Sequence, residues 1–413
     1  MRLEAAVLAL VALTAGADDN PVAAPLTALK LLSHNNSPTE VLVYTERGNR
    51  GFVEALLRAV AGVNAGRAVR REAPVSVLGA YKTPGEGLGA LRRRWRDRVP
   101  LDFVPVASRM DVWLQDVAEI GAAGGVPVLL GTARGRGLDR LVPALAARWG
   151  GTWTGLPAPA PGAANGAGNL EALPYGLVMI GATAGPGLRR FLAGQGYGRS
   201  LVELDTVWLE VGHVDEIVSH VVLDHGACGL ALLRASPGAA LDLLRHTPAR
   251  DLPRTLRRAV GSAGDDGAFH AGQTALEQRL ERIEAGLLSA IARRRPACRS
   301  VPVVRLPVLF RCAGSPGQPR RCRPLTPNTA NLVVLDRHVL VPDPGIDAFR
   351  GHIAERLRVL GQTPVFLDDR FYQRRRGGVH CATNVRRSPR VLLNPELESN
   401  RVSRAEGGGR RAE

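Results

Sequence analysis

The sequence predicts an α/β fold, because short apolar segments of strand type alternate along the chain with segments whose apolar residues recur at helical spacing. Most of the strand segments are bounded by Gly, Pro, Asn or Asp, which is typical of strands. We expect strands over residues 41–44, 75–78, 126–130, 176–180, 230–233, 301–304, 332–335 and 364–367. We expect helices over residues 51–61, 138–149, 188–195, 239–246, 275–295 and 349–360.

The length of 413 residues would suggest two or three domains of about 100–200 residues each, yet no change of composition divides the middle of the chain. Hydrophobic residues make up 45% and charged residues 22%, which is enough apolar material for a large core. Pro/Ala/Gly-rich segments predict loops at 157–170 and 314–321. The polar stretch 396–413 contains three consecutive glycines and is expected to be a disordered tail.

The first 17 residues resemble a secretory leader, since an apolar run from Ala5 to Thr14 precedes Ala15-Gly16-Ala17. An edge strand is the alternative, because Glu4 beside a single arginine departs from the charged start of such leaders. Cleavage would make the protein secreted or extracytoplasmic, and an uncleaved segment would leave it cytoplasmic. No later run reaches the roughly 20 apolar residues needed to cross a membrane, so we expect no membrane span.

The formal net charge is +16, and nearly all of the positive charge is arginine, since Lys30 and Lys82 are the only lysines. One interpretation is a polyanionic partner, and the other is a coding bias towards arginine. The arginines are scattered and aromatic residues make up only 4%, whereas single-strand binding depends on aromatic stacking. We therefore expect no specific nucleic-acid partner.

Five cysteines occur, and none forms a CxxC pair, so a structural zinc site is not expected. The odd number leaves at least one thiol free in a monomer. Cys312 and Cys322 flank the second loop and could pair if the chain is secreted.

Three short segments contain residues of catalytic type, although each residue taken singly also has a structural interpretation. His213 could be a core histidine, Cys381 a buried small hydrophobe, and Asp116 a cap or surface acid. The three segments are Trp113–Gly121, Val211–Glu216 and Gly377–Arg387.

Together, these segments supply the parts of a thiol reaction on a guanidinium group. A nucleophilic thiol such as Cys381 needs a group that stabilises its thiolate and a group that moves protons, and His213 is suited to the second task. Asp116 and Asp215 could accept hydrogen bonds from a guanidinium, which presents five donors in a rigid fork. His213 and Asp215 are two residues apart, so on an extended strand both side chains would face one pocket.

On these residues, the chain resembles the catalytic domain of the protein-arginine deiminases, members of the pentein or guanidine-modifying superfamily. The most specific segments are His213-Val-Asp215-Glu216 and His380-Cys381-Ala-Thr-Asn384. The resemblance runs from about residue 25 to 389 and implies a catalytic domain over 25–395. It also implies a propeller of five ββαβ modules around a central pocket, whereas periodicity alone supports only the α/β class. Further landmarks are 166–171, 235–237, 327–335 and 384–387.

The resemblance implies a catalytic role for four residues. Cys381 would attack the guanidinium carbon, and His213 would protonate the departing ammonia and then activate water. Asp116 and Asp215 would hold the guanidinium nitrogens. The implied reaction is hydrolysis of peptidyl-arginine to peptidyl-citrulline and ammonia through a covalent thiouronium on the cysteine.

Two further matches concern the substrate. Trp113 would line the slot for the aliphatic stem of the substrate arginine, and Arg136 would grip the substrate backbone. The latter favours arginine-containing proteins or peptides as partners. One alternative is an enzyme that acts on free arginine or a small guanidine. Another is a non-catalytic basic binding protein, which would not need all four residues of catalytic type.

The family binds two calcium ions in this domain, and the resemblance extends to the first site. The side chains of Gln115, Glu119 and Glu171 would bind the ion together with the backbone carbonyls of Ala167 and Leu170. Oxygen ligands are what calcium requires. The alternative is that Glu119 and Glu171 are ordinary surface acids.

The second family site departs from the pattern. Val117, Gly131 and Gly135 stand where the family has oxygen-bearing side chains. Because calcium affinity depends on the number of charged ligands, we expect this site to be lost and a single calcium ion to bind.

Overall fold

A computed structural model describes residues 29–85, 87–132, 134–155, 165–260, 266–313 and 321–391. The structure is of mixed α/β type, as the alternating pattern predicts. The expected leader, the expected tail and the ends of the 25–395 domain lie outside the described residues. So does most of the two expected loops. The loop predicted over 157–170 was wrong for residues 165–170. These residues contain a 3-10 turn (η4, Ala167–Asn169) and the start of a strand.

The strands of the described residues form five sheets of three or four strands and one two-stranded hairpin, β14 (Phe310–Ala313) with β15 (Arg321–Pro324). Sheet by sheet, the others are β1 (Lys30–Leu31), β5 (Ala118–Ala123), β6 (Val126–Gly131), β7 (Thr152–Gly155); β8 (Leu170–Ala172), β9 (Val178–Gly181), β10 (Leu201–Leu204); β11 (Val218–Val222), β12 (Leu230–Ser236), β13 (Val303–Pro307); β16 (Val333–Leu335), β17 (His338–Pro342), β18 (Thr363–Leu367); and β19 (Thr383–Val391), β2 (Asn36–Tyr44), β3 (Ser76–Tyr81), β4 (Leu101–Pro105).

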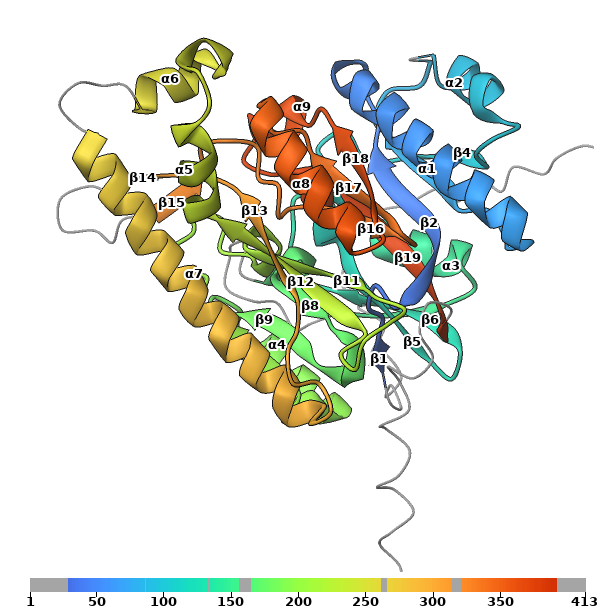
Figure 1. The fold of residues 1–413 in the computed structure, drawn as a ribbon. Coiled ribbons are helices and arrows are strands. Elements are labelled where there is room, and N and C mark those ends of the chain that lie inside the picture. Colours follow the sequence, from blue (N-terminus) through green and yellow to red (C-terminus); the bar gives the residue numbers. More distant parts are fainter. Residues whose placement is uncertain are drawn as a thin grey trace, which may run out of the picture.

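The helices lie mainly outside the sheets, with the long α7 along one flank (Figure 1). All six expected helices are present with shifted ends, and each expected strand overlaps an observed one. The helices are α1 (Arg50–Arg70), α2 (Leu88–Trp95), α3 (Leu141–Arg148), α4 (Pro186–Leu192), α5 (Pro237–Arg245), α6 (Arg254–Val260), α7 (Asp266–Arg294), α8 (Asp347–Val359), α9 (Arg370–Gln373) and α10 (Val379–Ala382).

The five sheets repeat one unit. In each, two antiparallel strands are followed by at least one helix and by a strand parallel to the second, as in β8, β9, α4 and β10. The parallel connections run through α1, α2, α3, α4, α5 to α7, and α8. Parallel strands need such crossovers, and the helices then cover the apolar sheet faces.

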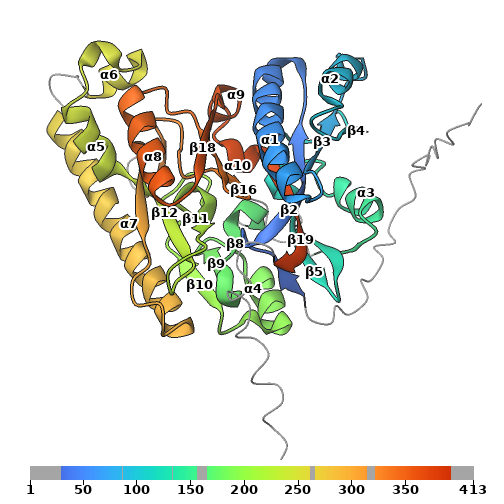
Figure 2. The same ribbon diagram turned by 45° about the vertical axis from the view of Figure 1, so that its right-hand side comes forward.

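The strand β19 was not expected, because its sequence contains three arginines and no apolar alternation. It pairs with β2 in antiparallel register, so the last described strand lies beside the second one in a single sheet. Its Arg387 is buried and donates hydrogen bonds to the backbone carbonyls of Asn36 and Val334, which satisfies the guanidinium inside the protein. Figure 2 shows that α10, directly before β19, consequently lies near the middle of the molecule.

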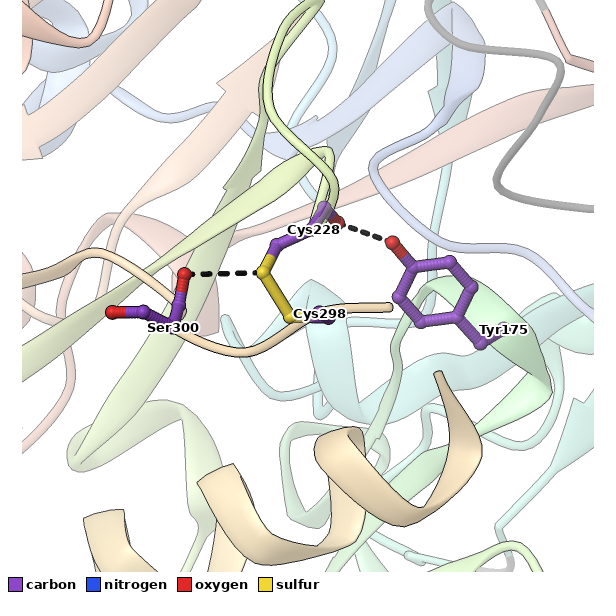
Figure 3. Close-up of a disulfide and its surroundings, with 4 residues drawn as sticks. All are labelled: Tyr175, Cys228, Cys298 and Ser300. Atoms are coloured by element: carbon purple, nitrogen blue, oxygen red, sulfur yellow. Dashed lines mark hydrogen bonds between the residues drawn. A yellow bond between two sulfur atoms is a disulfide. The ribbon is translucent and has the colours of Figure 1, made fainter. Parts of the chain in front are cut away.

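Two disulfides are present. Cys312 pairs with Cys322 across the β14–β15 hairpin, as the sequence suggested for a secreted chain. Cys228 pairs with Cys298, a bond between residues 70 positions apart that spacing could not indicate. Around it, the Tyr175 hydroxyl donates to the Cys228 carbonyl (Figure 3). Among the described residues, the free cysteine is Cys381. No helix in this part of the chain has the length and apolar character to cross a membrane.

Candidate active site

Cys381, the expected nucleophile, lies on the single turn of α10, and its partner is an asparagine. The Asn331 side-chain amide donates to the Cys381 sulfur at 3.2 Å, and its carbonyl oxygen accepts the Cys381 backbone N–H at 3.1 Å. Asn331 lies two residues before β16, in the segment 327–335 that the sequence indicated without assigning it to the site. The two bonds fix the orientation of the thiol.

The surroundings of Cys381 favour the neutral thiol. Burial raises the pKa of Cys381 well above its ordinary value, and the negative charge of Asp215 raises it further. The Asp215 carboxylate oxygen Oδ2 lies 3.4 Å from the sulfur. Asp116 and Glu216 act in the same direction. A positive charge entering this site would therefore favour formation of the thiolate.

His213 and Asp215 do not lie on an extended strand, so the reason given for their convergence was wrong. Asp215 is in a 3-10 turn, η7 (Val214–Glu216), and His213 precedes it in extended conformation. Glu216 closes the turn, because its carboxylate accepts the backbone N–H groups of Gly212 and His213 at 3.0 and 3.1 Å. Burial, followed by the charge of Asp215, raises the pKa of Glu216 to about 7.

His213 and Asp215 nevertheless lie close together, and Gly166 and Gly168 make room for them. A Cβ added to Gly168 would come within 2.8 Å of both the Asp215 carboxylate and the His213 ring. A Cβ added to Gly166 would come within 2.4 Å of the Asp116 carboxylate and 2.8 Å of the same ring. His213 is thus next to both acids, and its Nδ1 lies 4.0 Å from Asp116. Only glycine tolerates so close an approach.

Asp116 lies in a second 3-10 turn, η2 (Leu114–Val117), and is buried. Its Oδ2 accepts a hydrogen bond from Arg134 Nε at 2.9 Å, so a guanidinium from the chain itself contacts this carboxylate. Asn384 of β19 fixes the turn, because its amide donates to the carbonyls of Leu114, Gln115 and Ala118. This contact gives Asn384, which belongs to the family-like segment 384–387, a structural role.

The two residues expected to contact substrate differ in position. Trp113 is near the thiol: a Cβ added to Gly377 would come within 2.6 Å of its indole and 3.1 Å of the Cys381 Cβ. Arg136 instead forms an ion pair with Asp111 at 3.0 Å, and its side chain is 59% exposed. It lies at the surface, where a substrate backbone would have to displace Asp111.

His380 connects the two acidic parts of the site, a link the sequence did not reveal. Its Nδ1 lies 2.8 Å from Asp215 Oδ2 and its Nε2 lies 3.0 Å from Glu171 Oε1. Burial alone would lower the pKa of His380, but Glu171 and Asp215 raise it to about 10. The other Asp215 oxygen, Oδ1, is buried with no donor among the described residues. It is therefore a free acceptor for an N–H group.

The expected calcium ligands Gln115, Glu119 and Glu171 line one small cavity of about 40 Å³. Burial raises the pKa of Glu119 well above its ordinary value, and Glu171 adds to the effect. Glu119 is buried and the Glu171 side chain is 14% exposed, so the cavity presents two carboxylates of the kind that binds calcium. His380 and Arg387 also line the cavity and compete for these carboxylates. Ala167 and Leu170 are buried on the neighbouring turn and strand.

No group of three or more His, Cys, Asp and Glu residues with metal-binding geometry lies in the part of the chain that the structure describes. The expected set contains only two such residues, with an amide and two carbonyls completing it, so it would not form such a group. Val117, at the second family site, is buried in the apolar core.

A cavity of about 530 Å³ leads from the surface to Cys381. Asn331, Gly377 and Gly378 line its inner end beside the sulfur. It is large enough for an extended arginine side chain with part of its backbone.

A family model described as Protein-arginine deiminase (PAD) matches residues 93–259 and 289–392. Protein-arginine deiminase type-1 of Homo sapiens is 28% identical over 329 residues, which are 69% of this chain and 47% of that protein. Protein-arginine deiminase type-3 of Rattus norvegicus is 31% identical over 245 residues, 54% of this chain and 36% of that protein. The chain thus spans about half the length, or less, of the curated relatives it matches.

The agmatine deiminase of C. jejuni is similar in structure, with a TM-score of 0.54 over 87% of this chain and 96% of that chain. The sequence identity is 11%, so this similarity shows a shared fold and nothing further. The mixed α/β class predicted from the sequence is confirmed, and the five-module propeller stays a prediction.

Proposed function

The chain belongs to the protein-arginine deiminase family, and from this premise we propose that it hydrolyses the guanidino group of arginine residues in proteins or peptides, giving citrulline and ammonia. One observation supports this most directly. A free thiol lies at the end of a cavity with a buried carboxylate beside its sulfur, and a histidine and a second buried carboxylate adjoin that group; one oxygen of the first carboxylate has no donor among the described residues. Such a site is complementary to a planar cation that is open to attack at carbon.

The charges of the site support a mechanism in which substrate binding activates the nucleophile. Asp215 and Asp116 hold the guanidinium, whose positive charge offsets the carboxylates that raise the pKa of Cys381. The thiol then passes its proton to His213, and the thiolate adds to the guanidinium carbon. The carbon–nitrogen bond breaks, and His213 protonates the leaving ammonia. Water, deprotonated by His213, hydrolyses the carbon–sulfur bond, releasing citrulline and restoring the thiol.

We also propose one calcium site, formed by Gln115, Glu119 and Glu171 with the carbonyls of Ala167 and Leu170. When bound, calcium would supply positive charge that neutralises the buried carboxylates. Gln115 and Glu119 flank Asp116 in sequence, so the same residues would hold the η2 turn in position for substrate. Arg134, now on Asp116, would have to leave before a substrate guanidinium could bind there.

Two further proposals concern architecture and compartment. We propose that the five repeated ββαβ units surround the site as a propeller. The recurrence of the unit supports this, and so does the convergence of η2, η7 and α10 from different units. Secretion or an extracytoplasmic location is proposed because disulfides persist in oxidising compartments.

The second candidate is hydrolysis of free arginine or another small guanidine. The exposed position of Arg136, paired with Asp111, favours it, because the contact expected for a peptide backbone is engaged elsewhere. The test is a citrulline assay on a blocked arginine peptide, on free arginine and on agmatine, each with calcium and with chelator. Calcium-dependent turnover of the peptide supports the first proposal. Turnover confined to the small guanidines would replace it with the second.

A further inference from the structure

The outer part of the Cys381 cavity is strongly basic. Its described lining contains one acid, Glu216, which is buried and binds the backbone N–H groups of Gly212 and His213. Glu210, outside the lining, pairs with one of the arginines, Arg376. The arginines of the lining are Arg258, Arg311, Arg323, Arg374 and Arg376.

Two of these arginines face each other on the β14–β15 hairpin. Arg311 is directly opposite Arg323 in the antiparallel register, and both side chains are exposed. Like charges in this position destabilise a strand pair. The neighbouring cross-strand disulfide, Cys312–Cys322, fixes this register. No ion pair to either arginine is present among the described residues, and the intervening loop sequence, Gly-Ser-Pro-Gly-Gln-Pro-Arg, contains no acid.

This arrangement opposes the entry of the substrate that the inner site is suited to bind. A target arginine is a cation, and five arginines around its path repel it. The repulsion disappears if the substrate brings negative charge next to its arginine. The same negative charge would also relieve the repulsion between Arg311 and Arg323.

We propose that Arg311 and Arg323 form an anion subsite that binds side-chain carboxylates flanking the target arginine, so that the preferred substrate is an acidic segment of a protein. This proposal rests on the proposed deiminase function, and it specifies which class of substrate that site would prefer. A single arginine side chain can bind a carboxylate with two parallel hydrogen bonds, so each of the two could take one carboxylate. The inner acids select the guanidinium and the hairpin selects its sequence context.

The first experiment compares blocked peptides in which the target arginine is flanked by two Gly, two Glu, two Lys or two phosphoserine residues. A peptide that ends in arginine with a free carboxylate is the fifth. We expect KM to be roughly fivefold to tenfold lower for the Glu peptide than for the Gly peptide at low salt, on the scale of two partly exposed ion pairs. The difference should shrink at 0.5 M salt. A stronger preference for phosphoserine or for the terminal carboxylate would overturn the assignment to side-chain carboxylates.

The second experiment reverses the subsite with Arg311→Glu/Arg323→Glu. The matched control is Arg58→Glu/Arg358→Glu, which makes the same change of net charge at two exposed residues outside the cavity lining. We expect the subsite variant to favour the Lys peptide over the Glu peptide and to bind the Gly peptide at least as well as wild type, because two of the arginines that repel the target arginine are gone. The control should keep the wild-type order. An equal effect in both variants would show that the preference depends only on the net charge of the protein, and it would overturn the subsite.

A binding measurement separates this proposal from the proposed function. Fluorescence anisotropy of a labelled Glu-flanked arginine peptide is measured on Cys381→Ala, with and without the hairpin reversal. If no peptide yields citrulline, the deiminase proposal fails, but a loss of peptide affinity of at least fivefold on reversal still supports the anion subsite. Unchanged affinity on reversal overturns the subsite, whatever the citrulline assay gives.

Discussion

The inner and outer parts of the Cys381 cavity have opposite charge. Around Cys381, at the inner end of the cavity, lie the buried acids Asp116, Asp215 and Glu216, of which Glu216 lines the cavity itself. The outer part contains five arginines, two of them on a disulfide-closed hairpin. The inner acids raise the pKa of the thiol, so they oppose the nucleophile until a cation binds. The outer arginines oppose the approach of that cation. Each part is therefore electrostatically unfavourable until a substrate of complementary charge is present.

This difference separates two kinds of requirement. On the proposed function, the inner part matches one chemical group, the guanidinium, and its residues occur in segments that resemble the family. The outer part must match the sequence around that group, which differs between substrates. Specificity that arises from repulsion of unsuitable partners is a recognised route to discrimination.

The largest effect is expected when the inner part loses its nucleophile. Cys381→Ser should reduce deimination at least about a thousandfold, because a serine hydroxyl has no accessible anionic form at neutral pH. Citrulline formation under single-turnover conditions is the measurement. Retention of more than a tenth of the wild-type rate would remove Cys381 from the mechanism.

Asp215→Asn should separate the two effects of the Asp215 carboxylate, which are to bind the guanidinium and to raise the pKa of Cys381. Deimination should fall about a hundredfold, with both KM and kcat affected, because the guanidinium loses an anionic partner. Removing the carboxylate should also lower the pKa of Cys381, since Asp215 raises it. Alkylation of the substrate-free protein by iodoacetamide should therefore reach its half-maximal rate at a lower pH than in wild type. If alkylation keeps the wild-type pH profile, Asp215 does not control the thiol.

The substitution Glu171→Gln tests the proposed calcium site. Calorimetric titration of metal-free wild type with calcium should give one site, and activation should be non-cooperative. The variant should require at least tenfold more calcium for half-activation, because affinity depends on ligand charge. Val117→Glu is the control and should not create a second site. Two tightly bound ions in wild type, or full activity in chelator, would contradict the proposal.

The sequence predicted those features of the site that depend on side-chain type, and it missed those that depend on tertiary contact. Cys381, His213, Asp116 and Asp215 were proposed because their chemistry and segments are distinctive, and the structure brings them together. Asn331 and His380 were not, because their significance lies in contacts to Cys381, Asp215 and Glu171 that join distant segments.

The elements of the fold also differ in whether the sequence alone could predict them. Apolar segments such as those of β2, β12 and α8 were predictable, since burial sets their periodicity. The polar strand β19 was not, because its arginines are satisfied by backbone carbonyls elsewhere in the structure. The pairing of Cys228 with Cys298 likewise required the tertiary structure.

The smallest expected effect concerns the stability of the outer part. Arg311→Glu should turn the repulsive pair with Arg323 into an attractive one and stabilise the protein by about 0.5–1 kcal/mol, the scale of a cross-strand pair. Arg323→Glu should have the same sign, and the double reversal should return close to wild type because it restores like charges. Thermal unfolding of the four proteins forms a double-mutant cycle whose coupling should weaken in 0.5 M salt. Additive single effects would show that the two arginines do not interact. The single variant should also lose the preference for acidic peptides while gaining stability, which a purely structural role of the hairpin arginines does not predict.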